Sequence, residues 1–374
     1  MSLTIGALRE SAPLETRVSL VPEVAEKFAK EGARVLIERG AGERARFPDA
    51  LYKNVTWAQS TAEVLAQSDV LLTVQPLTVA QIGALRPGAV LVGLLQPHAR
   101  TAEVRALKQR GVTSFAMELV PRISRAQSMD ALSSQAAIAG YKAVLIAANL
   151  LQKFLPMLTT AAGTIRPAQV LVIGAGVAGL QAVATARRLG AVVEAYDVRS
   201  ATREQVKSLG AKFVDTGVSA EGSGGYAREL TAEERAREQE VLDSHVAAAD
   251  AVVTTAAVPG RPAPKIILRG AVERMRPGSV VVDIAAEQGG NCELTRPGEV
   301  IEHQGVKIAG PVNLAAELAY NASEMYARNL FNFLKPAIVK GELAIDWNDE
   351  VFAQACLTRA GEIRHAPTAQ ALEG

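Results

Sequence analysis

The feature that most constrains the fold of this chain is a glycine-rich turn between a predicted strand and a predicted helix. Residues 169–173 form an unbroken run of β-favouring side chains, and they lead directly into the sequence GAGVAG at 174–179. Residues 180–189 then have the apolar spacing of a helix. Three spaced glycines are a weak signal alone, but strand, turn and helix here follow the order of a Rossmann-type unit. The turn therefore predicts a parallel sheet covered by helices.

The three glycines of this turn have separate roles in binding a dinucleotide. Gly174 permits the tight turn, Gly176 lets a pyrophosphate approach the backbone, and Gly179 lets the helix pack on the strand. The start of the helix offers unpaired N–H groups and a partial positive charge to the phosphates. The sequence therefore predicts a phosphate-binding turn at 174–179.

An acidic residue follows at the expected distance. Residues 192–196 are predicted to be the next strand, and Asp197 stands at its end. A carboxylate there accepts hydrogen bonds from ribose hydroxyls and repels a 2′-phosphate, which favours NAD(H) over NADP(H). Arg199 weakens this preference, because a nearby arginine accepts a 2′-phosphate. The alternative, a glycine turn in a purely structural α/β domain, is disfavoured because strand, turn and carboxylate coincide at the required spacing.

Strand-like and helical patterns alternate along most of the chain. The first series of predicted strands lies at 4–8, 34–38, 70–74, 90–95 and 114–117, with helices at 22–30, 61–67, 78–84 and 101–109. The second series of strands lies at 169–173, 192–196, 212–214, 251–254, 279–284 and 306–309. An alanine-rich helical pattern from about 129 to 155 separates the two series, and the segment 163–167 is predicted to break it.

These patterns predict an α/β protein with two Rossmann-like domains, whose parallel sheets flank a cleft and are joined by long helices. The first domain is expected to be discontinuous and to comprise residues 1–134 and about 311–374. Residues 135–310 are expected to form the NAD(H)-binding domain. The polar tail from about residue 359 is expected to be irregular.

The composition excludes several classes of function. The chain has 374 residues and a net charge of +1, so no charge excess favours nucleic acid or an anionic membrane surface. The two cysteines are far apart and the four histidines are dispersed, which predicts neither a disulfide framework nor a metal site. No signal peptide is evident and no stretch reaches the ~18 apolar residues of a membrane span. These features favour a cytoplasmic protein.

The segment PRISRAQSMDALSSQ at 121–135 is dense in hydrogen-bonding groups. On a helix, Gln127, Asp130 and Ser133 share one face because they stand three residues apart. An amide such as that of Gln127 suits the nicotinamide carboxamide, which has both a donor and an acceptor. The same segment equally fits a helix start, with Ser124 or Ser128 as the capping residue. The pattern leaves both interpretations open.

A second candidate loop at 283–294 follows a predicted strand, and such loops line the ligand crevice of an open parallel sheet. Glu287 in this loop is either functional or a solvated loop residue. Hydride transfer between two nicotinamide rings requires neither a metal nor proton transfer, only the correct distance and orientation.

Four motifs carry a resemblance to a known family. They are PRISRAQSMDALSSQ at 121–135, GAGVAG at 174–179, TTAAVPGRPAP at 254–264 and VDIAAEQGGNCEL at 282–294. Over nearly its whole length the chain resembles the alanine dehydrogenase superfamily. Within it, the chain resembles the soluble NAD(H)-binding component, domain I, of the proton-translocating NAD(P) transhydrogenases.

The resemblance implies a role for individual residues. Arg122 and Gln127 are expected near the nicotinamide, with support from Asp130 and Ser133. Three further positions are expected to bind the rest of NAD(H), with Val177 and Gly179 at the pyrophosphate and Asp197 at the adenosine ribose. Gly225 and Tyr226 are expected on a mobile loop, within about 217–230, that closes over the nucleotide.

The resemblance also implies partners. It predicts direct hydride transfer between NADH and NADP⁺ that is held on a separate component, together with a membrane-embedded transhydrogenase subunit and a homodimer. Because the chain stops near Gly374 without an apolar tail, we expect these partners on separate polypeptides, with this chain peripheral to the cell membrane.

The main alternative is an alanine dehydrogenase, which the chain resembles at Glu10 and Arg17. Those enzymes place a substrate-binding lysine where this chain has Val74, and a catalytic histidine where it has Gln96. Amino acid oxidation needs an acid/base group, so their absence argues against this alternative. A third possibility, a non-catalytic NAD-binding module, is disfavoured by the specific motifs at 121–135 and 282–294.

Overall fold

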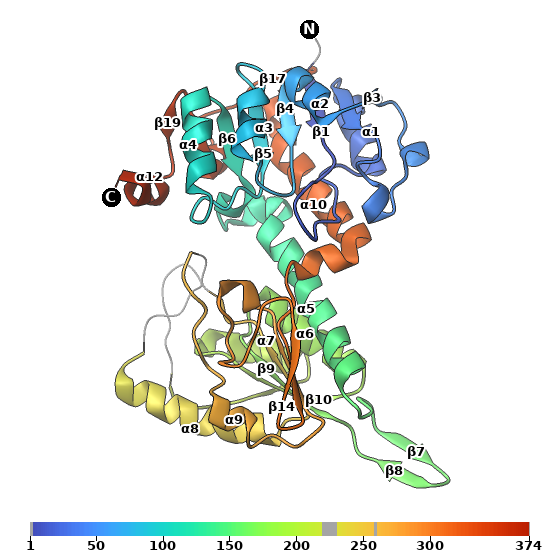
Figure 1. Cartoon of the computed structure of the whole chain (residues 1–374), viewed down its shortest axis with the longest axis vertical. Coiled ribbons are helices and arrows are strands. Elements are labelled where there is room, and N and C mark those ends of the chain that lie inside the picture. The colour runs from blue at the N-terminus through green and yellow to red at the C-terminus, as the bar shows by residue number, and fades with distance from the viewer. Residues whose placement is uncertain (1–2, 219–229, 258–259, 374) are drawn as a thin grey trace. The chain divides into compact units, whose positions relative to one another are not determined.

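The computed structural model describes residues 3–218, 230–257 and 260–373, and these residues form two compact units (Figure 1). The first unit comprises Met1–Gln135 and Ala315–Gly374, and the second comprises Ala136–Leu314. The first unit is therefore built from two stretches of chain that are far apart in sequence. Each unit contains its own sheet and its own apolar core.

The sheet of the first unit has the strand order β19-β18-β6-β5-β4-β1-β2-β3. Its six parallel strands are β1 (Thr4–Ala7), β2 (Arg34–Glu38), β3 (Thr56–Ala58), β4 (Val70–Leu72), β5 (Val90–Gly93) and β6 (Thr113–Ala116). Alternate side chains along these strands point to opposite faces. Ile5 and Val35 pack on one face beneath α1 (Pro22–Lys30) and α10 (Ala319–Leu334). On the other face, Leu36 and Leu71 pack beneath α2 (Thr61–Gln67), α3 (Val79–Ala84) and α4 (Thr101–Arg110).

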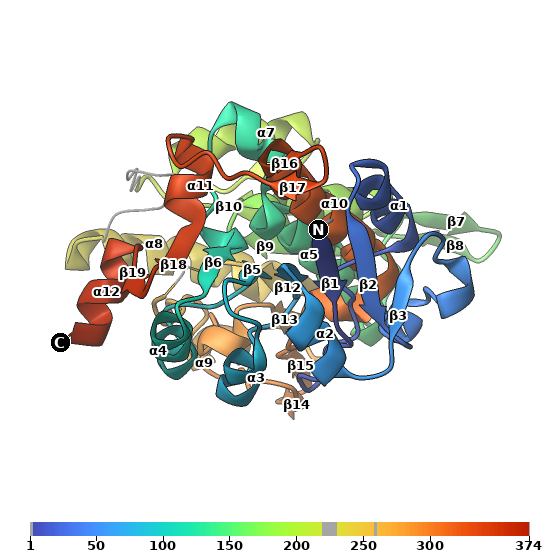
Figure 2. The same ribbon diagram turned by 90° about the horizontal axis from the view of Figure 1, so that it is seen from above.

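The end of the chain is ordered, and the expectation of an irregular tail was wrong. Strands β18 (Cys356–Arg359) and β19 (Glu362–Ile363) extend the first sheet beyond β6 in antiparallel orientation, as Figure 2 shows. The helices α11 (Glu350–Ala355) and α12 (Ala366–Glu373) flank them. The strands are too short to show periodicity, and the turn uses Ala360 and Gly361 at positive φ rather than an obvious turn pair such as Asn-Gly.

The second unit has the strand order β11-β10-β9-β12-β13-β15-β14, with β14 antiparallel at the edge. The strands are β9 (Gln169–Ile173), β10 (Val192–Tyr196), β11 (Lys212–Phe213), β12 (Ala251–Thr254), β13 (Val280–Asp283), β14 (Val300–His303) and β15 (Val306–Ala309). Its helices are α6 (Val177–Arg188), α7 (Arg203–Ser208), α8 (Ala232–Ala248) and α9 (Arg269–Val272). Sequence analysis missed β3 and β14, which are short edge strands.

In both sheets the first strand lies between the second and the fourth, so the two sheets share one topology. In the first unit β1 lies between β2 and β4, and in the second β9 lies between β10 and β12. At such a point the connections leave the sheet in opposite directions and open a crevice at the carboxyl ends of the strands. The prediction of two Rossmann-like α/β folds is confirmed.

The predicted long helix is shorter than expected. Helix α5 comprises Ala131–Leu150, and a 3₁₀ segment at Ser124–Met129 precedes it. Among the described residues, α5 is long and apolar enough to cross a membrane by length and composition, which the sequence analysis overlooked. Its Ala143, Val144 and Ala147 lie in the core of the second unit, and a core helix of this kind meets the same criteria.

The segment predicted as a simple break is a β-hairpin. Strands β7 (Leu158–Thr160) and β8 (Gly163–Ile165) pair with each other in antiparallel register, and all six residues are exposed. Figure 1 shows the hairpin projecting away from the sheet of its own unit.

Candidate functional site

The glycine turn of the second unit connects β9 to α6 through only three residues, Gly174, Ala175 and Gly176. Gly174 has a φ of 95°, which favours glycine over residues with a side chain. Helix α6 then starts after Gly176, and no side chain caps its N-terminus. The first N–H groups of α6 are therefore available to an anion, as a phosphate-binding turn requires.

The three glycines meet different surroundings, and this separates a structural role from a ligand role. A Cβ at Gly179 would lie 1.7 Å from the Gly174 carbonyl oxygen, and a Cβ at Gly174 would lie 2.6 Å from Thr255 Oγ1. These two glycines are required by the packing of the turn itself. A Cβ at Gly176 would meet no atom within 4 Å, and its φ of −76° is ordinary. Gly176 therefore leaves open space beside the helix start that the fold does not need.

Asp197 is buried at the end of β10, with 7% of its side chain exposed, and both of its oxygens are engaged. Oδ2 accepts a hydrogen bond from the Ala175 N–H at 2.7 Å, so the carboxylate supports the glycine turn. Arg199 donates to the same carboxylate through Nε at 2.8 Å and through Nη2 at 2.7 Å. Sequence analysis assigned these two residues opposing effects on a 2′-phosphate, and the structure pairs them with each other.

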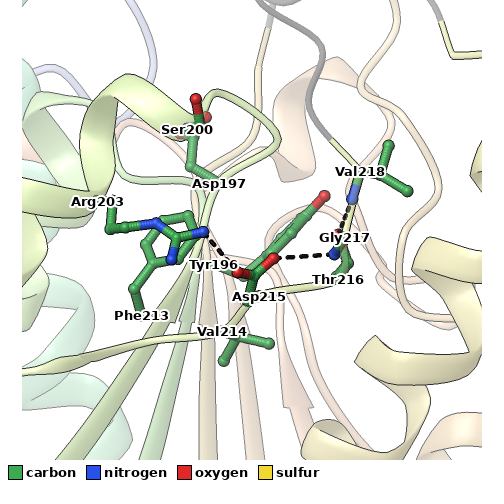
Figure 3. Close-up of a pocket in the computed structure, with 10 residues that line it drawn as sticks. All are labelled: Tyr196, Asp197, Ser200, Arg203, Phe213, Val214, Asp215, Thr216, Gly217 and Val218. Atoms are coloured by element: carbon green, nitrogen blue, oxygen red, sulfur yellow. Dashed lines mark hydrogen bonds and ion pairs between the residues drawn. The ribbon is translucent and has the colours of Figure 1, made fainter.

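A pocket of about 110 Å³ lies beyond the ends of β10 and β11 (Figure 3). Its walls include Asp197, Ser200, Phe213 and Thr216. Arg203 closes one side, where its guanidinium lies 5.0 Å from the Phe213 ring centroid.

Two further contacts shape this pocket. Arg203 donates to Asp215 at 2.6 Å, and Asp215 accepts from the Gly217 N–H at 2.9 Å. The Tyr196 hydroxyl donates to Glu238 on α8, and burial raises the pKa of both groups. Sequence analysis did not single out Arg203 or Asp215, because a charged pair twelve residues apart shows no local pattern.

The segment 121–135 lies in the first unit, and its polar residues differ in their engagement. Asp130 precedes α5 and accepts from the Ser133 N–H at 2.8 Å and from the Ser133 hydroxyl at 2.6 Å. Asp130 is therefore the capping residue, rather than Ser124 or Ser128. Arg122 and Gln127 are exposed, and the Gln127 amide makes no hydrogen bond with the described part of the chain.

The loop after β13 is organised by two buried polar residues that sequence analysis passed over. Asp283 is fully buried and accepts from the Thr254 and Thr295 hydroxyls at 2.9 and 2.6 Å, and from the Cys292 N–H at 2.9 Å. Asn291 donates to the carbonyls of Ala256 and Pro264, which ties this loop to the one after β12. Glu287 is exposed at the surface of the same loop.

The equivalent crevice of the first unit is filled by the protein's own side chains. Arg17 forms a bidentate ion pair with Glu15, at 2.8 and 2.7 Å, and donates to Gln135 at 2.8 Å. Glu15 is fully buried and Arg17 is 4% exposed. Burial alone would raise the pKa of Glu15, but its hydrogen bonds to Arg17 and the charge of Arg17 lower it.

Glu10 completes this filled crevice. Its carboxyl accepts from the N–H groups of Val74 and Gln75, directly after β4. Burial raises the pKa of Glu10 to about 8, so this carboxyl is largely protonated at neutral pH.

The two positions that decide between the sequence-based alternatives carry no acid or base. The Val74 side chain is fully buried in the core of the first unit. Gln96 is exposed, and its amide donates to Gln75 at 3.2 Å. The predicted nucleotide contacts Gly225 and Tyr226 lie outside the described residues.

Comparisons with known proteins agree with this arrangement of two units. Residues 6–139 match the alanine dehydrogenase/PNT N-terminal domain, and residues 143–366 match the C-terminal domain of the same family. The chain is 45% identical to the first of the polypeptides that make up NAD(P) transhydrogenase subunit alpha in Rhodospirillum rubrum, over 97% of this chain and 98% of that one. It is 44% identical to the crystal structure of a Sinorhizobium meliloti transhydrogenase, with a TM-score of 0.88 over 96% of this chain and 99% of that one. It is 32% identical to alanine dehydrogenase of Mycobacterium tuberculosis, over 79% of this chain and 76% of that one.

Proposed function

We propose that this chain, which belongs to the alanine dehydrogenase/PNT family and within it to the transhydrogenase alpha subunits, is the NAD(H)-binding component of a proton-translocating transhydrogenase. In this function a hydride passes directly between NADH on this chain and NADP⁺ on a separate component. The observation that carries the proposal is the three-residue turn between β9 and α6, whose Gly176 faces open space at an uncapped helix start.

The second unit fits a bound dinucleotide at both of its halves. Open space at Gly176 would allow the pyrophosphate to approach the first N–H groups of α6. Val177 and Gly179 begin this helix, and Asp197 lies at the neighbouring strand end to receive the adenosine ribose. When bound, the nicotinamide ring supplies the hydride, so the protein has only to bind and orient the nucleotide.

The roles of four residues of the first unit are part of the same proposal. Arg122 and Gln127 would contact the nicotinamide, and Gln127 has an exposed amide with both a donor and an acceptor to offer. Asp130 and Ser133 would support them, because their two mutual hydrogen bonds fix the start of α5. The Gln127→Ala variant should slow hydride transfer more than it weakens NADH binding. Arg125→Ala, which removes an exposed ion pair with Asp349, is the matched control and should change neither.

The alternative, an amino acid dehydrogenase, is disfavoured by the absence of a proton-transferring group at the positions that would carry it. Val74 is fully buried and Gln96 has an amide side chain. Turnover of L-alanine with NAD⁺, or of pyruvate and ammonia with NADH, is therefore expected to be undetectable. Measurable turnover in either direction would favour the alternative and contradict the transhydrogenase proposal.

The decisive experiment adds an NADP(H)-binding transhydrogenase component to this chain. We expect the mixture to transfer hydride from NADH to NADP⁺, and each protein alone to be inactive. The isolated chain should also bind NADH more tightly than NADPH. Equal affinity for the two nucleotides, or no transfer with an authentic partner, would contradict the proposal. The membrane-embedded subunit and a position at the cytoplasmic side of the membrane belong to the same proposed complex.

We also propose that the chain forms a homodimer, and the β7–β8 hairpin supports this. Its apolar side chains and those just before it are exposed, with Met157 at 64% and Ile165 at 42%. A two-stranded hairpin is marginal alone, so packing against a second copy would stabilise it. Sedimentation should show a dimer that Met157→Asp weakens. Val300→Asp, at an equally exposed apolar position on β14, should leave the dimer intact.

A further inference from the structure

The adenosine-ribose end of the proposed nucleotide site contains two arginines, and each is bonded to one aspartate. Arg199 forms two hydrogen bonds with Asp197, at 2.8 and 2.7 Å, and Arg203 forms one with Asp215 at 2.6 Å. The four side chains carry two positive and two negative charges, so this end of the site is electrically balanced. Asp197 and Arg203 line the pocket shown in Figure 3.

This balance changes the way in which Asp197 can select between nucleotides. A lone buried carboxylate would repel a 2′-phosphate, but here a guanidinium lies against both of its oxygens and offsets much of its charge. A guanidinium is also the side chain best suited to bind a phosphate with two parallel hydrogen bonds. In this chain that binding geometry is already used, because Asp197 occupies the donors that a 2′-phosphate would need.

We propose that Arg199 is a masked 2′-phosphate-binding residue, and that Asp197 determines nucleotide selectivity mainly by holding the Arg199 guanidinium. The inference rests on the proposed binding of NAD(H) at this unit. Arg199 is 24% exposed, so its guanidinium lies near solvent beside the pocket wall. Ser200 and Arg203, both in that wall, would add donors for the same phosphate. Loss of Asp197 would therefore create affinity for NADPH as well as remove a negative charge.

Charge repulsion alone makes a different prediction, and a double-mutant cycle separates the two. If Asp197 acts only by repulsion, Asp197→Ala should improve binding of a 2′-phosphate whether or not Arg199 is present. If Asp197 masks Arg199, the improvement should vanish in the double variant Asp197→Ala/Arg199→Ala. Suitable probes are 5′-AMP and 2′,5′-ADP, which differ only in the 2′-phosphate and need no nicotinamide contact.

Calorimetric titration of the full chain with both probes tests the proposal. We expect Asp197→Ala to bind 2′,5′-ADP at least about tenfold more tightly than the unmodified chain does. The double variant should lose that gain. The control Asp197→Ala/Lys212→Ala removes a cation at the other end of the sheet, where Lys212 pairs with Glu194, and should keep the gain.

Two further measurements keep the result interpretable. Asp197→Asn retains an oxygen that can accept from the Ala175 N–H, so it should show the same gain if Asp197→Ala fails to fold. Equal gains in the single and double variants would overturn the masking of Arg199. Failure of the unmodified chain to bind NADH or 5′-AMP would instead contradict the proposed function.

Discussion

The two units share a strand order but differ in the connection that follows the first strand. In the second unit, three residues join β9 to α6, and two of them are glycines. In the first unit, fourteen residues, 8–21, separate β1 from α1, and they carry Glu10, Glu15 and Arg17. The short connection leaves space at a helix start, whereas the long one fills the equivalent crevice with a buried ion pair. Topology thus fixes where a crevice forms, and the first connection decides whether a ligand can use it.

The largest expected effect comes from breaking the filled crevice of the first unit. Glu15→Ala would leave the buried Arg17 guanidinium without its ion-pair partner, which should lower the free energy of unfolding by about 3–5 kcal/mol. Glu23→Ala, which removes an exposed pair with Lys27 and Arg328, should cost less than about 1 kcal/mol. Denaturant unfolding of both variants provides the measurement. A similar loss in the two would mean that the buried pair does not hold the crevice closed.

The next largest effect should come from the packed side of the glycine turn. Gly179→Ala places a Cβ 1.7 Å from the Gly174 carbonyl oxygen, a clash between backbone-anchored atoms that no side-chain rotation relieves. We expect a loss of about 3 kcal/mol of stability or more, together with loss of NADH binding. Thermal unfolding and NADH titration check both parts. A stable variant that binds NADH normally would show that α6 can move away from β9.

The protonation of Glu10 predicts an unusual pH dependence for the first unit. Its pKa is about 8 in the folded protein and 4.5 for an ordinary glutamate, so the folded state binds more protons between these values. The contribution of Glu10 to stability therefore falls as pH rises from about 4.5 to 8, by at most about 1.4 kcal/mol per pH unit. Glu10→Gln should remove this slope. Unfolding measured at pH 6, 7 and 8 compares the two, and parallel curves would contradict the assignment.

The smallest and most informative effect should come from the open side of the turn. Gly176→Ala meets no atom within 4 Å, so stability should change by less than about 0.5 kcal/mol. The added methyl group would instead occupy space that a pyrophosphate needs, and NADH affinity should fall at least about tenfold. Calorimetric titration with NADH measures this. Unchanged affinity would remove the distinction between the open turn and the filled crevice.

The sequence predicted the strands and helices best where an element contributes a continuous apolar run. The strand Gln169–Ile173 and the helix Pro22–Lys30 lie where they were expected, because their patterns are long and bounded by turns. The elements after Cys356 were missed because each is two to eight residues long and only partly buried. The hairpin at 158–165 was missed because its exposed residues show no alternation between buried and exposed positions.

Within the candidate site, the sequence identified residues but not their partners. It singled out Asp197 and Arg199 separately, whereas their mutual hydrogen bonds depend on the conformation at the end of β10. It left the role of Asp130 open between a ligand contact and a helix start, and the two bonds from Ser133 identify it as a cap. Glu15 received no role, because an ion pair within an irregular connection has no periodic signal.

The division of the first unit into two stretches has a consequence for synthesis of the chain on the ribosome. The second unit, residues 136–314, is continuous and can fold as soon as it has emerged. The first unit must wait, because the Val18 N–H bonds to Ser323 and β6 pairs with β18. Until residues 315–374 emerge, the apolar face beneath α10 and one edge of the first sheet are uncovered. The nascent first unit is therefore the region of this protein most in need of a chaperone.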